Sequence, residues 1–412
     1  MSKFRPFRAI RPLRSNAKQV ASRPYDVLDS NEARKEAKDN PISFLRVIKP
    51  EIDLLPTADP YGEEVYRQGL AKFNELKEQG ILVQDKDAYF YIYRLTMDGR
   101  SQTGVVGCCD YQEYYDGSIK KHELTRTAKE NDRVRHVETQ NANAEPVFLS
   151  YRGDVRIDGL VSQVTDSAVE YDFIADDGIR HELWVVRDPS LIQGIEKSFS
   201  TISALYVADG HHRTAAAARV GQMRKENNPE HYGEEEYNFF MAVLFPDDQL
   251  KIFDYNRVVR DLNGRSQDDF LSELRESFEI SSLDQPQSPT ERGMFSMYLG
   301  GDWYLLKANK KKVTSSPKEE LDVTYLSDEV LEPILGITDL RKDLRIDFVG
   351  GIRGLSELER RVDSGEMAVA FALFPVSMDE LLAIADAGEI MPPKTTWFEP
   401  KLRSGLFIHD LE

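Results

Sequence analysis

One short stretch, in which a strand passes directly into a helix through a charged loop, constrains the fold of this chain most. The apolar run Leu205–Ala208 predicts a buried strand, Gly210 interrupts it, and the alanine-rich run from Arg213 to Val220 predicts a helix. Further strands and helices alternate around this junction, and a mixed sheet is the usual way to bury both. We therefore expect an α/β (α+β) fold.

The loop itself, Asp209-Gly210-His211-His212-Arg213, has the composition of an anion site. Backbone N–H groups at a helix start, the positive end of the helix dipole, two imidazoles and a guanidinium converge there, and Gly210 permits close approach to the main chain. In the simpler alternative, Asp209 only caps the helix and the histidines are surface residues. The density of hydrogen-bonding side chains favours the anion site.

The overall charge restricts the classes of partner. The 412 residues include 53 Lys and Arg against 71 Asp and Glu, a net charge of −18. Such a balance argues against a protein that coats nucleic acid or an anionic membrane. No apolar run approaches the roughly twenty residues of a membrane span, and the basic N-terminus lacks the apolar core of a secretory signal. We expect a cytoplasmic protein with a small-molecule substrate, no nucleic-acid partner and no membrane partner.

The pattern of apolar and turn residues predicts individual elements along the chain. They are a helix over 31–38 capped by Asp29 or Ser30, a strand over 43–49, a long helix from 59–60 to Gly80, a hairpin of 171–173 and 180–186 turning at Asp176-Asp177-Gly178, a helix over 189–199 and a strand over 238–245. Composition changes along the chain predict three parts: an N-terminal α/β part over 1–114, a core over 115–257 and a C-terminal α/β part over 258–412.

A second charged segment runs from Ile119 to Arg133. It contains Glu, His, Lys and Arg at high density, which is consistent with a binding segment. An exposed helix with ion pairs at three- and four-residue spacing, such as Arg126 with Glu130, explains the same pattern equally well. Lys394 and Lys401 near the C-terminus either add positive charge to a phosphate site or are solvated loop lysines, and spacing does not decide between the two.

Several separate motifs together resemble the prokaryotic domain-of-unknown-function family 1015. They are Arg23-Pro24-Tyr25-Asp26-Val27, His122-Glu123-x-Thr125 with Lys129 and Asp132-Arg133, Asp209–Arg213, Phe348-Val349-Gly350-Gly351 and Pro393-Lys394-Thr395-Thr396-Trp397-Phe398. More distantly, His-Glu followed by Asp-Gly-His-His-Arg, over roughly residues 115 to 220, is similar to the ParB/sulfiredoxin-like fold and especially its free-serine kinases.

The distant resemblance implies a nucleotide-binding core with phosphotransferase activity. In those kinases the loop that corresponds to Asp209–Arg213 cradles nucleotide phosphates, and the glutamate that corresponds to Glu123 is the base toward the serine hydroxyl. This implies an ATP- or ADP-dependent kinase that needs Mg²⁺ and phosphorylates free L-serine or a similar metabolite. The expected site comprises Glu123, Asp209 and His211 as catalytic residues, Asp209 as metal ligand, and Gly210, His211, His212, Arg213, Thr214, Arg126 and Lys129 as cofactor-binding residues.

Other uses of the same loop fit the sequence less well. The Gly-x4-Gly-Lys-Ser/Thr pattern of a Walker A loop is absent, and sulfiredoxin chemistry is disfavoured because His211 stands where that loop needs a cysteine. A DNA-partition or nuclease role lacks a basic recognition helix. One alternative of a different class stays open: a nucleotide-binding regulatory or scaffold protein without phosphoryl transfer. The oligomeric state is also left open.

Overall fold

The computed structural model describes residues 2–309 and 316–412, which gather into two compact units. Unit 1 comprises Met1–Lys121, Thr125–Leu250 and Pro400–Glu412, and unit 2 comprises His122–Leu124 and Lys251–Glu399. The three-part division predicted from composition is finer than these two units and stays a prediction. None of the helices in the described ranges is both long and apolar enough to cross a membrane.

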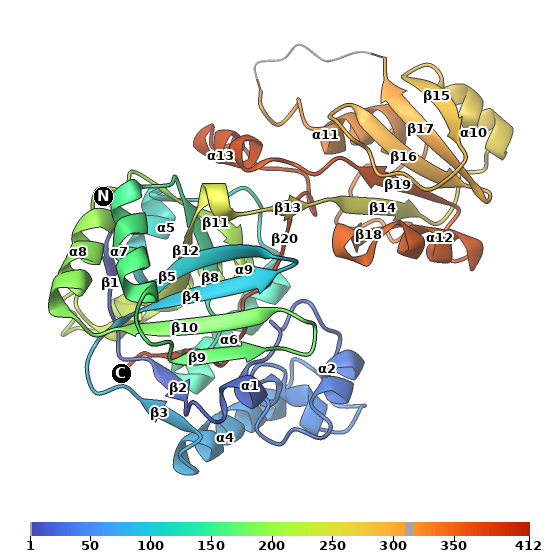
Figure 1. Ribbon diagram of the computed structural model, residues 1–412. Helices are drawn as coiled ribbons and strands as arrows, with labels where there is room; N and C mark the ends of the chain where they lie inside the picture. Colours follow the sequence, from blue (N-terminus) through green and yellow to red (C-terminus); the bar gives the residue numbers. More distant parts are fainter. Residues whose placement is uncertain (1, 310–315) are drawn as a thin grey trace. The chain divides into compact units, whose positions relative to one another are not determined.

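Unit 1 is built on a mixed nine-stranded sheet, so the predicted α/β class is confirmed (Figure 1). The strands run in the order β6-β11-β8-β12-β5-β4-β10-β9, and β1 pairs with β5. Most pairs are antiparallel, whereas β8 with β12 and β6 with β11 are parallel. Their bounds are β1 Phe4–Arg5, β4 Phe90–Met97, β5 Arg100–Asp110, β6 Ile119–Lys120, β8 Val147–Tyr151, β9 Tyr171–Ile174, β10 Arg180–Val186, β11 Leu205–Asp209 and β12 Phe239–Pro246.

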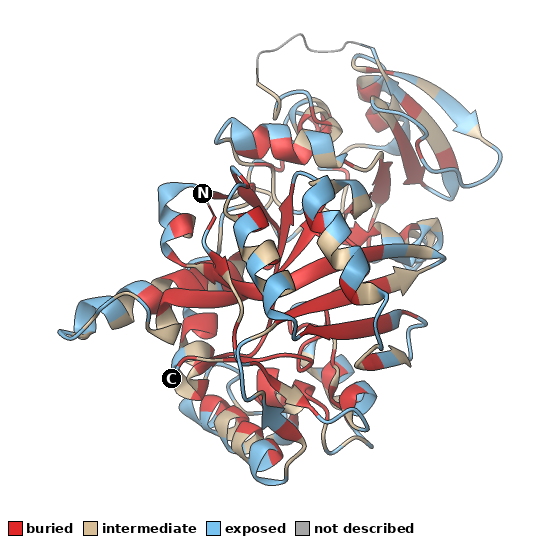
Figure 2. Cartoon of the chain, turned by 60° about the vertical axis from the view of Figure 1, so that its left-hand side comes forward, coloured by how far each residue is buried: buried red, intermediate tan, exposed pale blue. Residues whose placement is uncertain are grey.

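Helices cover this sheet and build a smaller N-terminal layer beside it. Their bounds are α1 Ala17–Val20, α2 Ser30–Glu36, α3 Leu45–Ile48, α4 Glu63–Glu78, α5 Gln112–Asp116, α6 Thr127–Gln140, α7 Val155–Thr165, α8 Pro189–Phe199 and α9 His211–Asn227. α7 packs with α8 and contacts β4 and β10, while α6 lies along α9 and α4 packs on α6. The strands are almost continuously buried and the helices expose one face (Figure 2). Cys108 and Cys109 are free thiols inside β5.

Most of the elements expected from the sequence are present. Asp29 caps α2 through a capping box with Glu32, α8 begins at Pro189 as predicted, and β9 and β10 form the hairpin around Gly178, whose φ is +82°. The strand predicted over 43–49 is wrong, because Leu45–Ile48 forms α3. Its apolar residues are buried within the N-terminal layer, so tertiary packing overrides their strand propensity.

The last residues of the chain return to the N-terminal part of unit 1. Strand β21, His409–Asp410, pairs with β7, Ala142–Asn143, and Ser404 and Ile408 bridge to Ser22 and Ile10. The two bridges fix the backbone at Ile10 and at Ser22, immediately before the segment that contains Tyr25 and Asp26. Residues more than 370 positions apart therefore form one layer.

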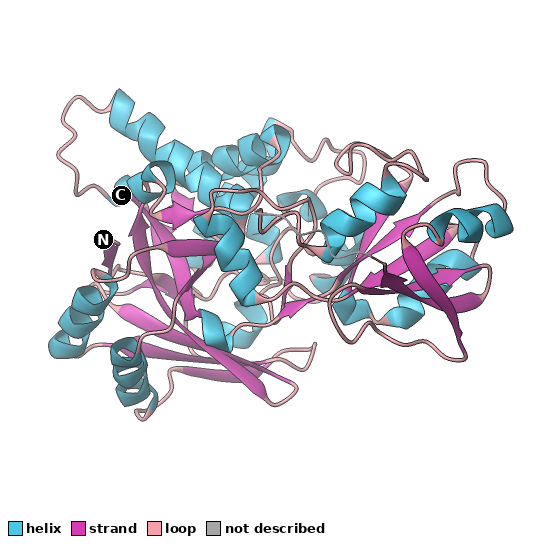
Figure 3. Cartoon of the chain, turned by 90° about the horizontal axis from the view of Figure 1, so that it is seen from above, coloured by secondary structure: helices cyan, strands magenta, loops and turns pink. Residues whose placement is uncertain are grey.

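Unit 2 is built on a six-stranded antiparallel sheet in the order β15-β17-β16-β19-β14-β18 (Figure 3). Its elements are β13 Ile252–Phe253, β14 Tyr255–Val259, α10 Gln267–Leu274, β15 Phe278–Leu283, β16 Met294–Leu299, β17 Asp302–Ala308, α11 Asp322–Leu326, β18 Ile346–Gly350, α12 Leu355–Asp363, β19 Val369–Leu373, α13 Met378–Asp386 and β20 Trp397–Phe398. Leu358 of α12 is buried with the sheet residues Val258, Tyr298 and Ala370 in one apolar cluster. Unit 2 therefore has a hydrophobic core of its own.

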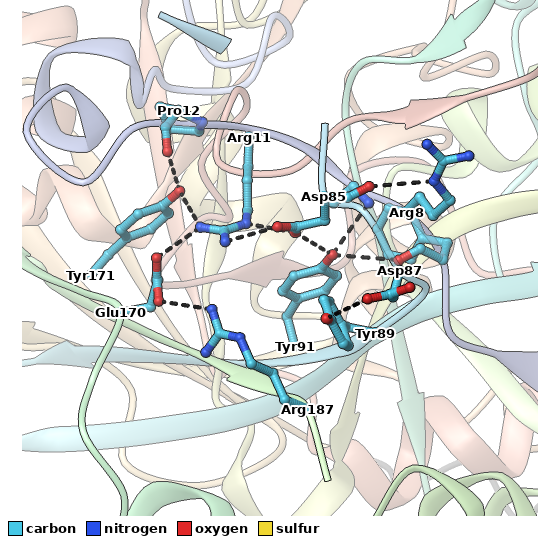
Figure 4. A network of polar contacts seen from close by, with 12 residues as sticks. Arg8, Arg11, Pro12, Asp85, Asp87, Tyr89, Tyr91, Glu170, Tyr171 and Arg187 are labelled. Atoms are coloured by element: carbon cyan, nitrogen blue, oxygen red, sulfur yellow. Dashed lines mark hydrogen bonds and ion pairs between the residues drawn. The ribbon is translucent and has the colours of Figure 1, made fainter. Parts of the chain in front are cut away.

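A buried ion-pair network ties the N-terminal strand pair to the sheet of unit 1 (Figure 4). Arg11 lies in β2, Ile10–Pro12, which pairs with β3, Leu82–Gln84. Its guanidinium contacts Asp85 through two hydrogen bonds of 2.6 and 2.9 Å and Glu170 through one of 3.0 Å. Tyr91 donates to the same Asp85 carboxylate at 2.8 Å. The side chains of Arg11 and Asp85 are only 11% and 14% exposed, so each charge depends on the other.

We expect Arg11→Met to lower the free energy of unfolding by about 3 kcal/mol, because it leaves two acidic side chains without their buried partner. Arg8→Met is the matched control, since Arg8 is exposed and donates long hydrogen bonds to the Asp85 carbonyl, at 3.3 Å, and to Gln84 Oε1, at 3.4 Å. The control should change stability by less than about 0.5 kcal/mol. Chemical denaturation of the three proteins gives the comparison, and equal effects of the two substitutions would contradict the role of the network.

Candidate functional site

The loop of residues 209–213 joins the end of β11 to the start of α9, as the sequence predicts. Gly210 has φ +88°, a conformation that favours glycine. A Cβ at Gly210 would also lie 2.9 Å from Arg213 Nε, so the guanidinium packs directly over the glycine. No side chain caps the first turn of α9. Asp209 is therefore not the N-terminal cap that the simpler sequence hypothesis assumed.

Asp209 lies within a row of alternating charges. Its Oδ2 is 3.4 Å from Lys401 Nζ and 3.5 Å from Arg213 Nη2, and the latter nitrogen is 3.7 Å from Asp26 Oδ2. Burial raises the pKa of Asp209, but Lys401, Arg213 and His211 more than offset this and lower it to about 2. The carboxylate is therefore ionised at neutral pH. Lys401, which the sequence left undecided, lies beside the loop.

The Arg213 guanidinium is buried and only partly paired. Its side chain is 6% exposed, its Nη1 donates to the Pro146 carbonyl at 2.7 Å, and its Nε has no hydrogen-bond partner within residues 2–309 and 316–412. Both of its ion pairs are longer than the 2.7–2.9 Å of a strong charge-assisted hydrogen bond. Arg213 thus retains capacity to bind an additional anion.

The histidines of the loop differ in their surroundings. His211 is buried, and burial lowers its pKa to about 4, with His212, Lys121 and Arg213 adding to the effect and Asp209 opposing it. His212 Nε2 accepts a hydrogen bond of 3.0 Å from the backbone N–H of Arg126, the residue before α6. Thr214 Oγ1 donates to the Gly210 carbonyl at 3.0 Å. At neutral pH His211 therefore offers hydrogen bonds without a positive charge.

A polar cavity of about 260 Å³, here called the Tyr25 cavity, lies next to this row of charges. Asp26, the partner of Arg213, is part of its wall. The residues that line it are Tyr25, Asp26, Leu28, Asp29, Ser30, Ile48, Lys49, Glu51, Pro60, Tyr61, Lys129, Asp132, Arg133 and His136. Lys129, Asp132, Arg133 and His136 follow helical spacing along α6 and so present one face of that helix to the cavity.

The cations of this cavity are paired to different degrees. Arg133 bonds to Asp132 at 2.6 Å and to Glu145 at 3.1 Å, and its guanidinium lies 3.8 Å from the centre of the Tyr25 ring. Lys49 pairs with Glu51 at 3.2 Å. Lys129 lies 6.0 Å from the Tyr25 ring and has no carboxylate within ion-pair distance among the described residues. Lys129 is exposed, and partial desolvation by its neighbours, with Arg133 adding to it, lowers the pKa of its ammonium group.

The buried carboxylate of Glu145 connects the cavity wall to the N- and C-terminal segments. Its oxygens accept hydrogen bonds from Arg133, from the Tyr25 backbone N–H at 3.2 Å and from Ser404 Oγ at 3.4 Å. Sequence reasoning missed Glu145, Asp26 and Tyr25 as site residues. Tyr25 and Asp26 do have a signal in the sequence, because both belong to the Arg-Pro-Tyr-Asp-Val motif, to which the sequence alone assigns no role. Nothing local distinguishes Glu145.

The predicted base, Glu123, belongs to unit 2 rather than to the unit that holds the loop. It is half-buried and makes no hydrogen bond or ion pair among the residues described. The neighbouring His122 is anchored within unit 2: its carbonyl accepts from Met391 N–H at 2.8 Å, and its Nε2 lies 3.3 Å from Thr396 Oγ1. The His-Glu motif and the Lys394-Thr395-Thr396 segment therefore lie side by side.

The Phe-Val-Gly-Gly motif and the Pro-Lys-Thr-Thr-Trp-Phe motif also meet in unit 2. β18, which contains the first three residues of the Phe-Val-Gly-Gly motif, pairs with β14, and β20, which contains Trp397, pairs with β13. A Cβ at Gly350 would lie 2.9 Å from the Trp397 ring, so this glycine leaves room for the indole. Within the described ranges no group of three or more His, Cys, Asp and Glu side chains is arranged to hold a metal ion.

We expect the burial of neutral His211 to make stability depend on pH. The folded protein protonates His211 only near pH 4, whereas an unfolded chain does so near pH 6.5, so its contribution is full above pH 6.5 and is lost as the pH falls toward 4. The difference corresponds to about 3 kcal/mol at most. Denaturation between pH 4 and 7 should show that His211→Gln removes this part of the pH dependence, and parallel curves for the two proteins would contradict it.

Comparison with solved structures gives distant likenesses. A free serine kinase mutant in complex with AMP is 13% identical with a TM-score of 0.37, and the match covers 74% of this chain and 92% of that one. A conserved hypothetical protein from Pyrococcus furiosus is 14% identical with a TM-score of 0.35, covering 74% and 94%. C-terminally truncated SbnI from Staphylococcus aureus is 12% identical with a TM-score of 0.38, covering 73% and 85%. At these values the likeness says nothing about activity, and the ParB/sulfiredoxin-like core stays a prediction.

Comparison with protein families gives a clear result, although no curated relative matches the sequence. The family model described as "Protein of unknown function (DUF1015)" matches residues 4–324. This range contains three of the five motifs that suggested the resemblance, including the loop of residues 209–213 and the Arg-Pro-Tyr-Asp-Val segment. Because the match covers most of the chain, the protein belongs to the DUF1015 family.

Proposed function

We propose that the protein is a nucleotide-dependent kinase that phosphorylates the hydroxyl group of a small metabolite. The observation that carries the proposal is the buried, incompletely paired Arg213 guanidinium at the start of α9, next to the Tyr25 cavity and its Lys129. The resemblance of the His-Glu and Asp-Gly-His-His-Arg motifs to free-serine kinases makes L-serine the leading acceptor.

The charge pattern supports a phosphate ligand. Arg213, Lys129 and Lys401 are three cations near the loop, and the ion pairs to Asp209 are 3.4 and 3.5 Å long. A phosphate oxygen would form shorter charge-assisted contacts with the same groups, and the uncapped N-terminus of α9 would add backbone donors. The ligand would thus add negative charge beside Arg213, whose buried positive charge is only partly compensated.

The size of the cavity suits a small ligand or part of a larger one. Its volume of about 260 Å³ is slightly below the roughly 300 Å³ at which small-molecule pockets begin. The Tyr25 ring forms one wall, and the Arg133 guanidinium lies over its face. Lys129 lines the cavity, and Arg213 lies next to it through its ion pair with Asp26. The proposal therefore assigns the phosphates to Arg213 and Lys129.

Phosphoryl transfer needs charge neutralisation and an acceptor placed in line with the leaving oxygen. The bond between the bridging oxygen and the terminal phosphorus breaks, and a new bond forms from the acceptor oxygen to that phosphorus. The acceptor's proton passes to Glu123, whose carboxylate has no other hydrogen bond among the described residues. Asp209, the last residue of β11 and the first of the loop, is the proposed protein ligand for Mg²⁺, which would supply additional charge neutralisation when bound with the nucleotide.

Nucleotide affinity tests the phosphate assignment. Lys129→Gln should weaken binding of ADP or ATP by about ten-fold, because one charge-assisted contact contributes roughly 1.5 kcal/mol. Lys77→Gln is the matched control, since Lys77 is an exposed helical lysine that lies 4.4 Å from the Phe73 ring in α4. Isothermal titration calorimetry with Mg²⁺ present measures the affinities. Equal affinities for the two variants would remove Lys129 from the site.

Turnover tests the transfer step. Glu123→Gln keeps the shape of the side chain and removes the base, so turnover should fall by about a hundred-fold or more while nucleotide affinity stays nearly constant. Phosphorus NMR of nucleotide and L-serine gives the rate, and Glu64→Gln in the first turn of α4 is the control. A protein that binds nucleotide but phosphorylates no hydroxyl compound in a metabolite screen would support the regulatory alternative and contradict the kinase proposal.

A further inference from the structure

A second and larger polar cavity lies in unit 1, on the other side of the segment that contains Tyr25. Its volume is about 410 Å³, within the range of small-molecule pockets. We call it the Arg403 cavity. The side chains that bear on its chemistry are Lys18, Arg23, Glu36, Asp176, Asp177 and Arg403. Arg23 precedes Tyr25 and Asp26 of the first cavity by two and three positions, so one segment contributes to both walls.

Arg403 is the buried charge of this cavity. Its side chain is 6% exposed, and its Nε donates to His181 Nε2 at 3.3 Å. Because Nε2 accepts this bond, the ring proton of His181 is on Nδ1, which lies 2.7 Å from Tyr93 OH. Burial, with Arg403 adding to it, lowers the pKa of His181 well below its ordinary value. His181 is therefore neutral and orients the guanidinium without compensating its charge.

Among the residues that the structure describes, the one carboxylate paired with Arg403 comes from an exposed turn. Asp177, in the turn between β9 and β10, bonds to Arg403 Nη2, and its side chain is 37% exposed. Arg403 Nη1 makes no hydrogen bond among the described residues. Arg23 has a similar partner, Glu36, which is 34% exposed. Both counter-ions can thus turn toward water, whereas Arg403 cannot.

We propose that the Arg403 cavity binds a small oxyanion-bearing metabolite, a carboxylate or a phosphate ester, through Arg403 and Arg23. The ligand displaces Asp177 from Nη2 of the buried guanidinium and bonds to Nη1 and Nη2 together, a bidentate contact that planar guanidinium groups make with both classes of oxyanion. The displaced Asp177 is solvated on its turn, so its charge is not left buried. The proposal goes beyond the kinase function and does not depend on it.

The two cations and their displaceable counter-ions give opposite predictions for two substitutions. Asp177→Asn removes the competing carboxylate and should tighten oxyanion binding by about ten-fold, whereas Arg23→Gln removes one contact and should weaken it by about the same factor. Asp172→Asn is the matched control on the same hairpin, because Asp172 is exposed and pairs with Arg180. All three positions are on the surface, and thermal unfolding verifies that the variants fold.

Calorimetric titration with malonate and with inorganic phosphate at low ionic strength measures the affinities and separates the two ligand sources. Each titration is repeated on Lys129→Gln, so that phosphate bound at the first site is recognised by its response to that substitution. The proposal predicts binding that Asp177→Asn tightens, Arg23→Gln weakens, and Lys129→Gln leaves unchanged. It is overturned if neither anion binds to the parent protein or to Asp177→Asn. It is also overturned if an anion binds but neither Asp177→Asn nor Arg23→Gln changes the measured affinity.

Discussion

The arrangement of unit 1 around its candidate site depends on the buried guanidinium of Arg213. A charge in this position is stable only with compensation, and the compensation comes from Asp209 at 3.5 Å, Asp26 at 3.7 Å and the Pro146 carbonyl at 2.7 Å. These groups belong to β11, to the N-terminal segment and to the approach to β8. Pairing with Arg213 therefore fixes three separate segments at the start of α9.

The neighbouring charges extend the same principle. Lys401 compensates Asp209 from the C-terminal segment, and Glu145 compensates Arg133 while its oxygens also bond to Tyr25 and Ser404. The segment from Ser22 to Asp26 is thus held from both sides and forms part of the wall of two polar cavities. Arg213 beside the Tyr25 cavity and Arg403 in the Arg403 cavity are both buried, and each is paired with a carboxylate that is about one-third exposed, Asp26 and Asp177 respectively. A buried arginine with a partly exposed counter-ion is suited to ligand binding, because an incoming anion replaces a carboxylate that water can solvate.

Local sequence signals were sufficient for much of the fold. Gly210, between an apolar run and an alanine-rich run, predicts the junction of β11 and α9. Pro189 predicts the start of α8, and Asp29 predicts the N-terminal cap of α2. The strand expected over 43–49 failed because burial within the N-terminal layer, and not local propensity, decides the conformation of Leu45–Ile48. The local sequence pattern does not show which residues other parts of the chain will bury.

The candidate site was predictable only where its residues are close in sequence. The sequence predicts the loop of residues 209–213, but it does not predict the hydrogen bond between this loop and Arg126. It also gives no role to Asp26 or Glu145 and leaves the role of Lys401 open. Lys401 and Asp209 are 192 positions apart, and the pairing of the C-terminal strand with β7 is what allows them to meet. Long-range pairing of this kind leaves no periodic signal in one sequence. The role of Glu123 and the position of Mg²⁺ remain predictions.

The most direct test of the central claim is a crystal structure of the protein with ADP bound. The account predicts that the phosphates lie at the N-terminus of α9, within hydrogen-bond distance of Arg213 or Lys129, with Asp26 or Asp209 moved away from the guanidinium. A nucleotide bound elsewhere, with the pairs between Arg213 and both carboxylates unchanged, would contradict it.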